Sequence, residues 1–112
     1  MDELEKAYQT LIDYENEVKN FLLRVCGTNS INQRGNWIDS AFSTYSKLEQ
    51  CQTTICCYTL SVIYDAMFNE SSSSDEISYC SRLYGNARQI SRNIANWLCS
   101  AKIILDTYNG AN

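Results

Sequence analysis

Six cysteines are the residues of this chain with the most chemistry to offer. They are Cys26, Cys51, Cys56, Cys57, Cys80 and Cys99. An even number of cysteines in a short chain often signals a disulfide framework. A zinc site is the alternative if the chain breaks near Thr53, and it would use Cys51, Cys56, Cys57 and Cys80. The paired CxxC spacing of structural zinc sites is missing, so we predict no metal.

Free thiols fit the expected geometry better. In an antiparallel bundle the cysteines of different helices differ in height by roughly 10 Å, whereas a disulfide needs Cα atoms within about 7 Å. Cys56 and Cys80 fall on or beside apolar stripes, where a reduced cysteine behaves as a small apolar residue. We therefore expect reduced thiols and a reducing compartment.

No set of residues predicts catalysis. The sequence has no histidine, which removes the usual general base and the commonest metal ligand. Its four glycines are too scattered to form a phosphate-binding loop. Glu15 and Glu17 lie two residues apart, so on a helix they point in different directions. We predict a protein that is not an enzyme, with no catalytic residue and no cofactor.

The charge favours a protein partner. Thirteen acidic residues against nine basic ones give a net charge of -4, which opposes nonspecific binding to nucleic acid or anionic lipid. Arg88 and Arg92, four residues apart, could contact phosphates, but a solvated face that complements the acidic N-terminal segment explains them better. Direct nucleic-acid binding is therefore not expected.

The elements that position these residues are expected to be helices. The 112 residues include no proline and only four glycines, which is typical of a few long helices joined by short links. A chain of this length forms one core, so residues 1–112 are predicted to be a single domain. The fold class that follows is all-α.

Apolar residues at three-and-four spacing predict an antiparallel bundle of three long helices, over residues 3–26, 36–69 and 75–109. The predicted stripe of the first helix is Leu4, Tyr8, Leu11, Glu15, Val18, Leu22 and Val25, with Ala7, Ile12 and Phe21 beside it. Gly27 is expected to be a left-handed cap, residues 28–35 a loop, and Ser73 with Glu76 a capping box. In the second helix, polar Gln52 meets two β-branched residues, so a kink or break near 52–54, giving four helices, is the alternative.

Location is predicted from two features. No apolar run reaches the roughly 18 residues that a membrane span needs. The N-terminus is acidic where a signal peptide would be basic and then apolar. We expect a cytoplasmic protein with no membrane association.

Helix lengths indicate a binding surface. At about 36 Å, the first helix cannot cover a second one of roughly 50 Å, so the hairpin end near the serine-rich linker stays uncovered. The aromatic and methionine residues predicted there are Tyr58, Tyr64, Met67, Phe68, Tyr79 and Tyr84. Such residues suit self-association, as a homodimer, or a heterologous partner. The alternative is that a kinked second helix folds them into the core.

We therefore predict a small non-enzymatic interaction protein, an inhibitor or adaptor of the kind that viral or mobile-element genes encode. One alternative is an acidic, anti-CRISPR-like inhibitor whose face of Asp13, Glu15 and Glu17 occupies the basic channel of a nucleic-acid-processing protein. Another is a secreted helical hairpin, because Trp37-Ile38-Asp39 followed by Phe42 resembles the WXG-type turn. The glycine of that turn is absent, and the third helix is additional.

Overall fold

Three long helices make up the structure. The computed structural model describes residues 2–27, 34–69 and 71–110. Its helices are α1 (Asp2–Gly27), α2 (Arg34–Met67) and α3 (Ser74–Gly110), and the described residues include no strand. The bundle measures 59 × 17 × 17 Å, and buried residues from all three helices form one elongated core. The predicted all-α fold with three antiparallel helices is confirmed.

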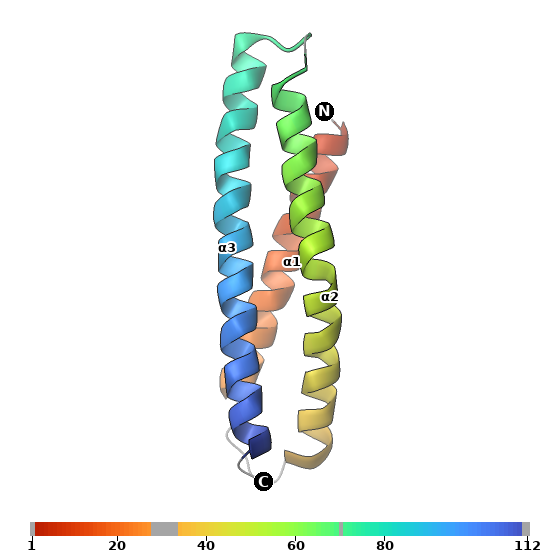
Figure 1. Ribbon diagram of the computed structural model, residues 1–112, viewed down its shortest axis with the longest axis vertical. Coiled ribbons are helices and arrows are strands. Elements are labelled where there is room, and N and C mark those ends of the chain that lie inside the picture. Colours follow the sequence, from red (N-terminus) through yellow and green to blue (C-terminus); the bar gives the residue numbers. More distant parts are fainter. Residues whose placement is uncertain (1, 28–33, 70, 111–112) are drawn as a thin grey trace.

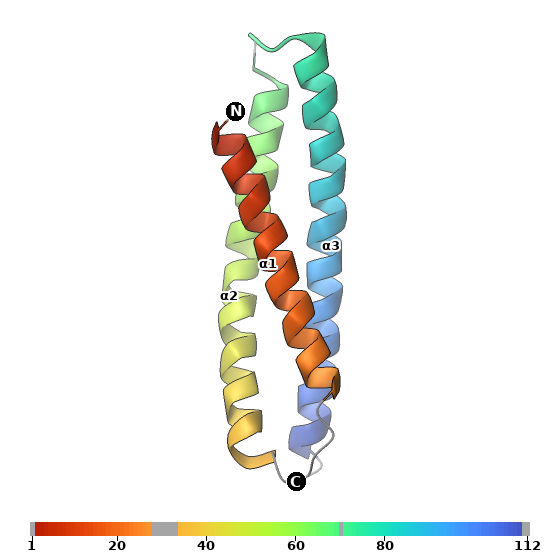
Figure 2. The same ribbon diagram turned by 180° about the vertical axis from the view of Figure 1, so that it is seen from behind.

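The helices form a hairpin with one helix laid across it. α2 and α3 run antiparallel and lie side by side along their length, and α1 covers one face of the pair (Figure 1). Seen from that face, α1 crosses the pair obliquely. The N-terminal end of α1 lies beside α2, and the C-terminal end of α1 lies beside α3 (Figure 2). Among the described residues, no third helix lies over the opposite face of the α2–α3 hairpin.

The core repeats in heptads, as in a coiled coil. In α1 the buried residues are Leu4, Ala7, Leu11, Tyr14, Val18, Phe21 and Val25, and in α3 they include Cys80, Ala87, Ile94, Leu98, Ala101 and Leu105. Tyr8, Glu15 and Leu22 of the predicted α1 stripe are only half-buried. Ala7 and Phe21, which were predicted beside the stripe, are buried, and so is Tyr14, which was not predicted. Tyr14 tolerates burial since its hydroxyl donates a hydrogen bond to the Leu48 carbonyl of α2.

α2 is one continuous helix, and the alternative with a break near 52–54 is wrong. Its buried residues follow the heptad up to Leu48 and resume at Cys56, with Gln52 half-buried between them. The steps from Leu48 to Gln52 and from Gln52 to Cys56 are each four residues long. The apolar stripe therefore moves around the surface of α2 while the helix itself continues. Thr53 and Thr54 face outward, so the helix accommodates them as exposed positions.

The helix ends agree with the sequence only in part. The Ser73–Glu76 capping box is confirmed, because the Glu76 N–H donates to the Ser73 hydroxyl at 3.2 Å. Gly27 is instead the last residue of α1, and no described glycine has a positive φ. α2 begins two residues before its predicted start, and residues 28–33 of the predicted loop lie outside the described part. No described helix has the length and apolar character that a membrane span requires.

Candidate protein-binding surface

The end of the hairpin extends beyond α1. Glu3 and Leu4 of α1 line a shallow depression with Val62 and Ala66 of α2, so α1 begins almost level with the last turn of α2. The following turn and the start of α3 project past the N-terminus of α1 (Figures 1 and 2). The predicted uncovered end therefore exists, although it is shorter than a simple comparison of helix lengths suggests.

Three aromatic side chains gather near the last turns of α2, and we call Tyr64, Phe68 and Tyr84 the hairpin-end cluster. The ring centroids of Tyr64 and Phe68 are 4.6 Å apart, and those of Tyr64 and Tyr84 are 6.2 Å apart. Phe68 is 67% exposed and Tyr64 is 50% exposed. Ile77, near the start of α3, is exposed as well. The cluster thus presents apolar area from both helices to the surroundings.

The other predicted members are divided between different surroundings. Met67 and Tyr79 are half-buried and pack against the core, and the Arg82 guanidinium lies 5.9 Å from the centroid of the Tyr79 ring. Tyr58 lies apart from the cluster, and its hydroxyl donates a hydrogen bond of 2.9 Å to Glu3 of α1. Tyr58 and Tyr64, six residues apart, point to different sides of α2, so the structure does not bring Tyr58 together with the cluster.

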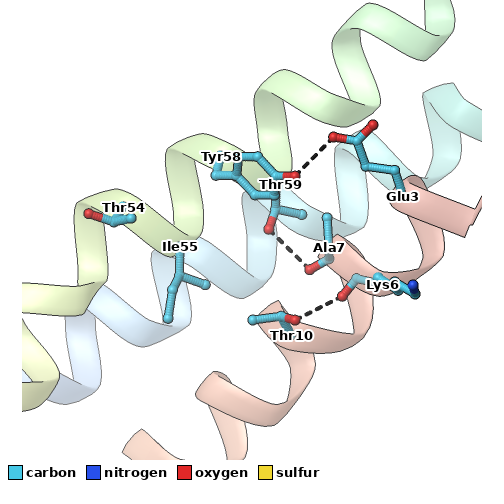
Figure 3. Close-up of a pocket in the computed structure, with 8 residues that line it drawn as sticks. All are labelled: Glu3, Lys6, Ala7, Thr10, Thr54, Ile55, Tyr58 and Thr59. Carbon is cyan, nitrogen blue, oxygen red and sulfur yellow. Dashed lines mark hydrogen bonds between the residues drawn. The ribbon is translucent and has the colours of Figure 1, made fainter.

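Tyr58 instead lines a groove between α1 and α2 (Figure 3). The groove has a volume of about 510 Å³, and its lining includes Ala7, Ile55 and Thr59. At its floor the Thr59 hydroxyl donates to the Ala7 carbonyl at 3.2 Å. The hydrogen bond to Glu3 and the charge of that carboxylate raise the pKa of the Tyr58 hydroxyl. Two hydrogen bonds at this groove therefore connect α1 to α2.

The predicted acidic face is divided between two sides of α1. The Asp13 carboxylate accepts a hydrogen bond of 2.9 Å from Gln9, one turn earlier, and both residues are exposed. Glu15 is half-buried and accepts a hydrogen bond of 3.4 Å from the Asn93 amide of α3. Glu17 lies four residues after Asp13, so these two side chains lie on the same face of α1. Glu15 lies on a different face. The three carboxylates do not form one continuous surface.

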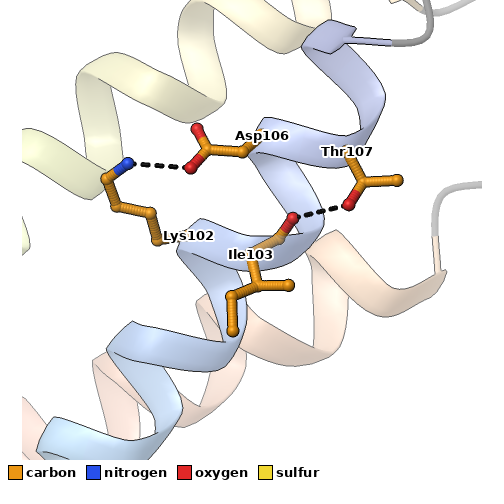
Figure 4. Close-up of polar contacts among 4 residues, drawn as sticks. All are labelled: Lys102, Ile103, Asp106 and Thr107. Carbon is orange, nitrogen blue, oxygen red and sulfur yellow. Dashed lines mark hydrogen bonds and ion pairs between the residues drawn. The ribbon is translucent and has the colours of Figure 1, made fainter.

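A second groove, which was not predicted, lies between α2 and α3 in the other half of the hairpin. It has a volume of about 490 Å³ and is lined by Tyr45, Glu49, Gln52, Thr53, Ala95, Leu98, Cys99, Lys102 and Ile103. Burial, together with the hydrogen bond to Glu49, raises the pKa of Tyr45 to about 12. The ammonium of Lys102, one of the lining residues, pairs with Asp106 at 2.8 Å (Figure 4), and this contact raises the lysine pKa.

The cysteines are free thiols in the structure. Cys56 and Cys80 are buried, as their positions beside the apolar stripes predicted, and the other four are exposed. Burial raises the pKa of the Cys56 thiol, although the nearby Ser91 hydroxyl acts in the opposite direction. Within the described ranges, no three His, Cys, Asp or Glu side chains are placed to share a metal ion.

Trp37 and Phe42, which resemble the WXG turn, lie inside α2, and Trp37 packs edge-on against Tyr108 with ring centroids 5.8 Å apart. The turn that the resemblance implies is thus replaced by helix. Comparisons with protein-family models, with curated proteins and with solved structures find no match to this chain.

Proposed function

We propose that this chain is a small non-enzymatic interaction module, an inhibitor or adaptor, that binds a protein through its hairpin-end cluster. The observation that carries the proposal is the contact of Tyr64 with both Phe68 and Tyr84, while Tyr64 and Phe68 stay at least half exposed. Large aromatic side chains, held by neighbours but left exposed, are the usual anchors of protein interfaces. A viral or mobile-element origin stays a prediction from the sequence.

The acidic-channel alternative has weaker support. A basic channel would attract Asp13 and Glu17, which share a face, but Glu15 already accepts a hydrogen bond within the bundle. Two exposed carboxylates on one helix are also common on surfaces that bind nothing. Aromatic anchoring therefore explains more of what is specific to this structure.

Photo-crosslinking at single positions tests the proposal. A benzoylphenylalanine residue replaces Phe68 in the full chain, expressed in the cells that naturally produce it, and adducts are analysed after irradiation. Because Phe68 would lie inside the interface, we expect a discrete protein adduct. Leu23 is the matched control, since it is 59% exposed but lies on α1 away from the cluster.

The same probe at position 23 should give no discrete adduct. Equal adducts at both positions, or none at position 68, would contradict the proposal. Helicity of each variant by circular dichroism checks that the probe has not unfolded the bundle.

A further inference from the structure

The hairpin-end cluster and the second groove lie on one surface of the molecule. The described lining of this groove comes only from α2 and α3, so the groove opens on the face that α1 does not cover. Tyr64 follows Thr53 by eleven residues, and Tyr84 precedes Ala95 by eleven. Eleven residues are about three helical turns, so each pair shares one side of its helix. We call this surface the α2–α3 face.

The two helices bring different charges to this face. α2 contributes exposed Glu49 and, two heptads before Thr53, Asp39. α3 contributes Lys102 and Arg88, each one heptad from Ala95, and Asp106 balances Lys102 in part. The α2 side is therefore acidic, and the α3 side is mainly basic.

We propose that a second copy of this chain docks on the α2–α3 face, related by a two-fold axis parallel to the long axis of the bundle. This inference rests on the proposed function and names the partner. Such an axis places α2 of one copy against α3 of the other. All four neighbouring helix pairs are then antiparallel, the arrangement of an antiparallel four-helix bundle.

The heights of the residues match under this symmetry. Tyr64 and Tyr84 are in contact within one copy, so they lie at one level, and the axis brings Tyr84 of the second copy toward Tyr64 and Phe68. Glu49 and Lys102 line one groove, so Lys102 of the second copy approaches Glu49. Opposite charges therefore meet at two symmetric places, with aromatic side chains meeting at the end.

Charge selects this orientation over the reversed one. If the second copy ran antiparallel, α2 would face α2 and α3 would face α3. The acidic residues of α2 would then meet acidic residues, and Arg88 would meet the basic side of the other copy, which is unfavourable. Small residues along the middle of the face, including Thr53 and Ala95, permit close approach of the helices.

A charge-exchange experiment on the full chain tests the inference. Sedimentation equilibrium of the wild type should give twice the chain mass of 12.8 kDa. Glu49→Lys alone and Lys102→Glu alone each create two like-charge contacts in the dimer, and each should weaken it about tenfold or more. An equimolar mixture should recover the wild-type affinity, because unlike charges then meet between different copies.

The mixture distinguishes contact between copies from effects within one chain. Each variant chain keeps its own substituted charge in the mixture, so only contacts between different chains can restore the affinity. Circular dichroism should show wild-type helicity for both variants. A wild-type chain that remains monomeric at about millimolar concentration, the range of weak association, would overturn the inference. So would a mixture that behaves as the sum of its two components.

Failure of the second-copy inference differs from failure of the proposed function. A monomeric chain that still gives an adduct with another protein at position 68 overturns only the inference. A dimer that responds to charge exchange but is unchanged by Phe68→Asp overturns the role of the hairpin-end cluster, and with it the proposed function.

Discussion

Two tyrosine hydroxyls show how burial decides what a single hydrogen bond contributes. Tyr14 is buried and donates to the Leu48 carbonyl, whereas Tyr58 is 51% exposed and donates to Glu3. Burial, the largest cause, raises the pKa of Tyr14 strongly. Water can replace the partner of Tyr58 but not that of Tyr14. The same chemical change should therefore have different effects at the two positions.

We expect Tyr14→Phe to lower the free energy of unfolding by about 1 kcal/mol, the usual net contribution of a buried hydrogen bond. Tyr58→Phe should leave the urea midpoint unchanged. Urea denaturation followed by circular dichroism measures both. Equal effects of the two substitutions would show that the Tyr14 hydroxyl is as accessible to water as that of Tyr58.

At this scale the sequence predicted the type of the core residues better than their positions. Tyr8 belongs to the predicted α1 stripe and Tyr14 does not, but only Tyr14 is fully buried. The choice depends on the Leu48 carbonyl of another helix, which sequence spacing does not reveal. The separation of Tyr58 from Tyr64, in contrast, could be predicted from the sequence. Six residues at about 100° each place two side chains on different sides of a helix.

At the level of the helices, α3 has the best-defined start. The Ser73 hydroxyl and the Glu76 carboxylate each accept a backbone N–H of the other residue, at 3.2 and 3.4 Å. We expect Ser73→Ala to lower the free energy of unfolding by about 1 kcal/mol, as is typical for loss of an N-cap. Thermal unfolding compares it with Ser74→Ala, the next serine along the chain, which should be near wild type. A larger loss for Ser74→Ala would place the cap elsewhere.

Helix number and bounds were predictable because the apolar spacing is long and regular. A continuous second helix was predicted and is confirmed, but a break near 52–54 stayed open as the alternative. Gln52 is a polar residue on the apolar stripe, and Thr53 and Thr54, which follow it, have low helix propensity. Packing overrides this propensity, because Leu48 and Cys56, on either side, are both buried in the core. The stripe shifts through Gln52, and local sequence does not distinguish such a shift from a break.

The whole molecule is a hairpin of two long helices with a shorter third helix on one face. α1 has 26 residues, against 34 in α2 and 37 in α3, and these lengths are what made the uncovered end predictable. The groove that contains Glu49 and Lys102 was not predictable. Its existence depends on how α2 and α3 are rotated about their axes, which only the packed structure defines.

The central claim is that the chain binds another protein through its hairpin-end cluster, and hydroxyl-radical footprinting tests it most directly. Oxidation rates of Phe68, Tyr64 and Leu23 are compared between the dilute purified chain and the complex isolated from its natural cells. We predict that Phe68 and Tyr64 are protected several-fold in the complex while Leu23 is oxidised at the same rate in both. Protection of Leu23, with Phe68 oxidised as fast as in the free chain, would contradict the account.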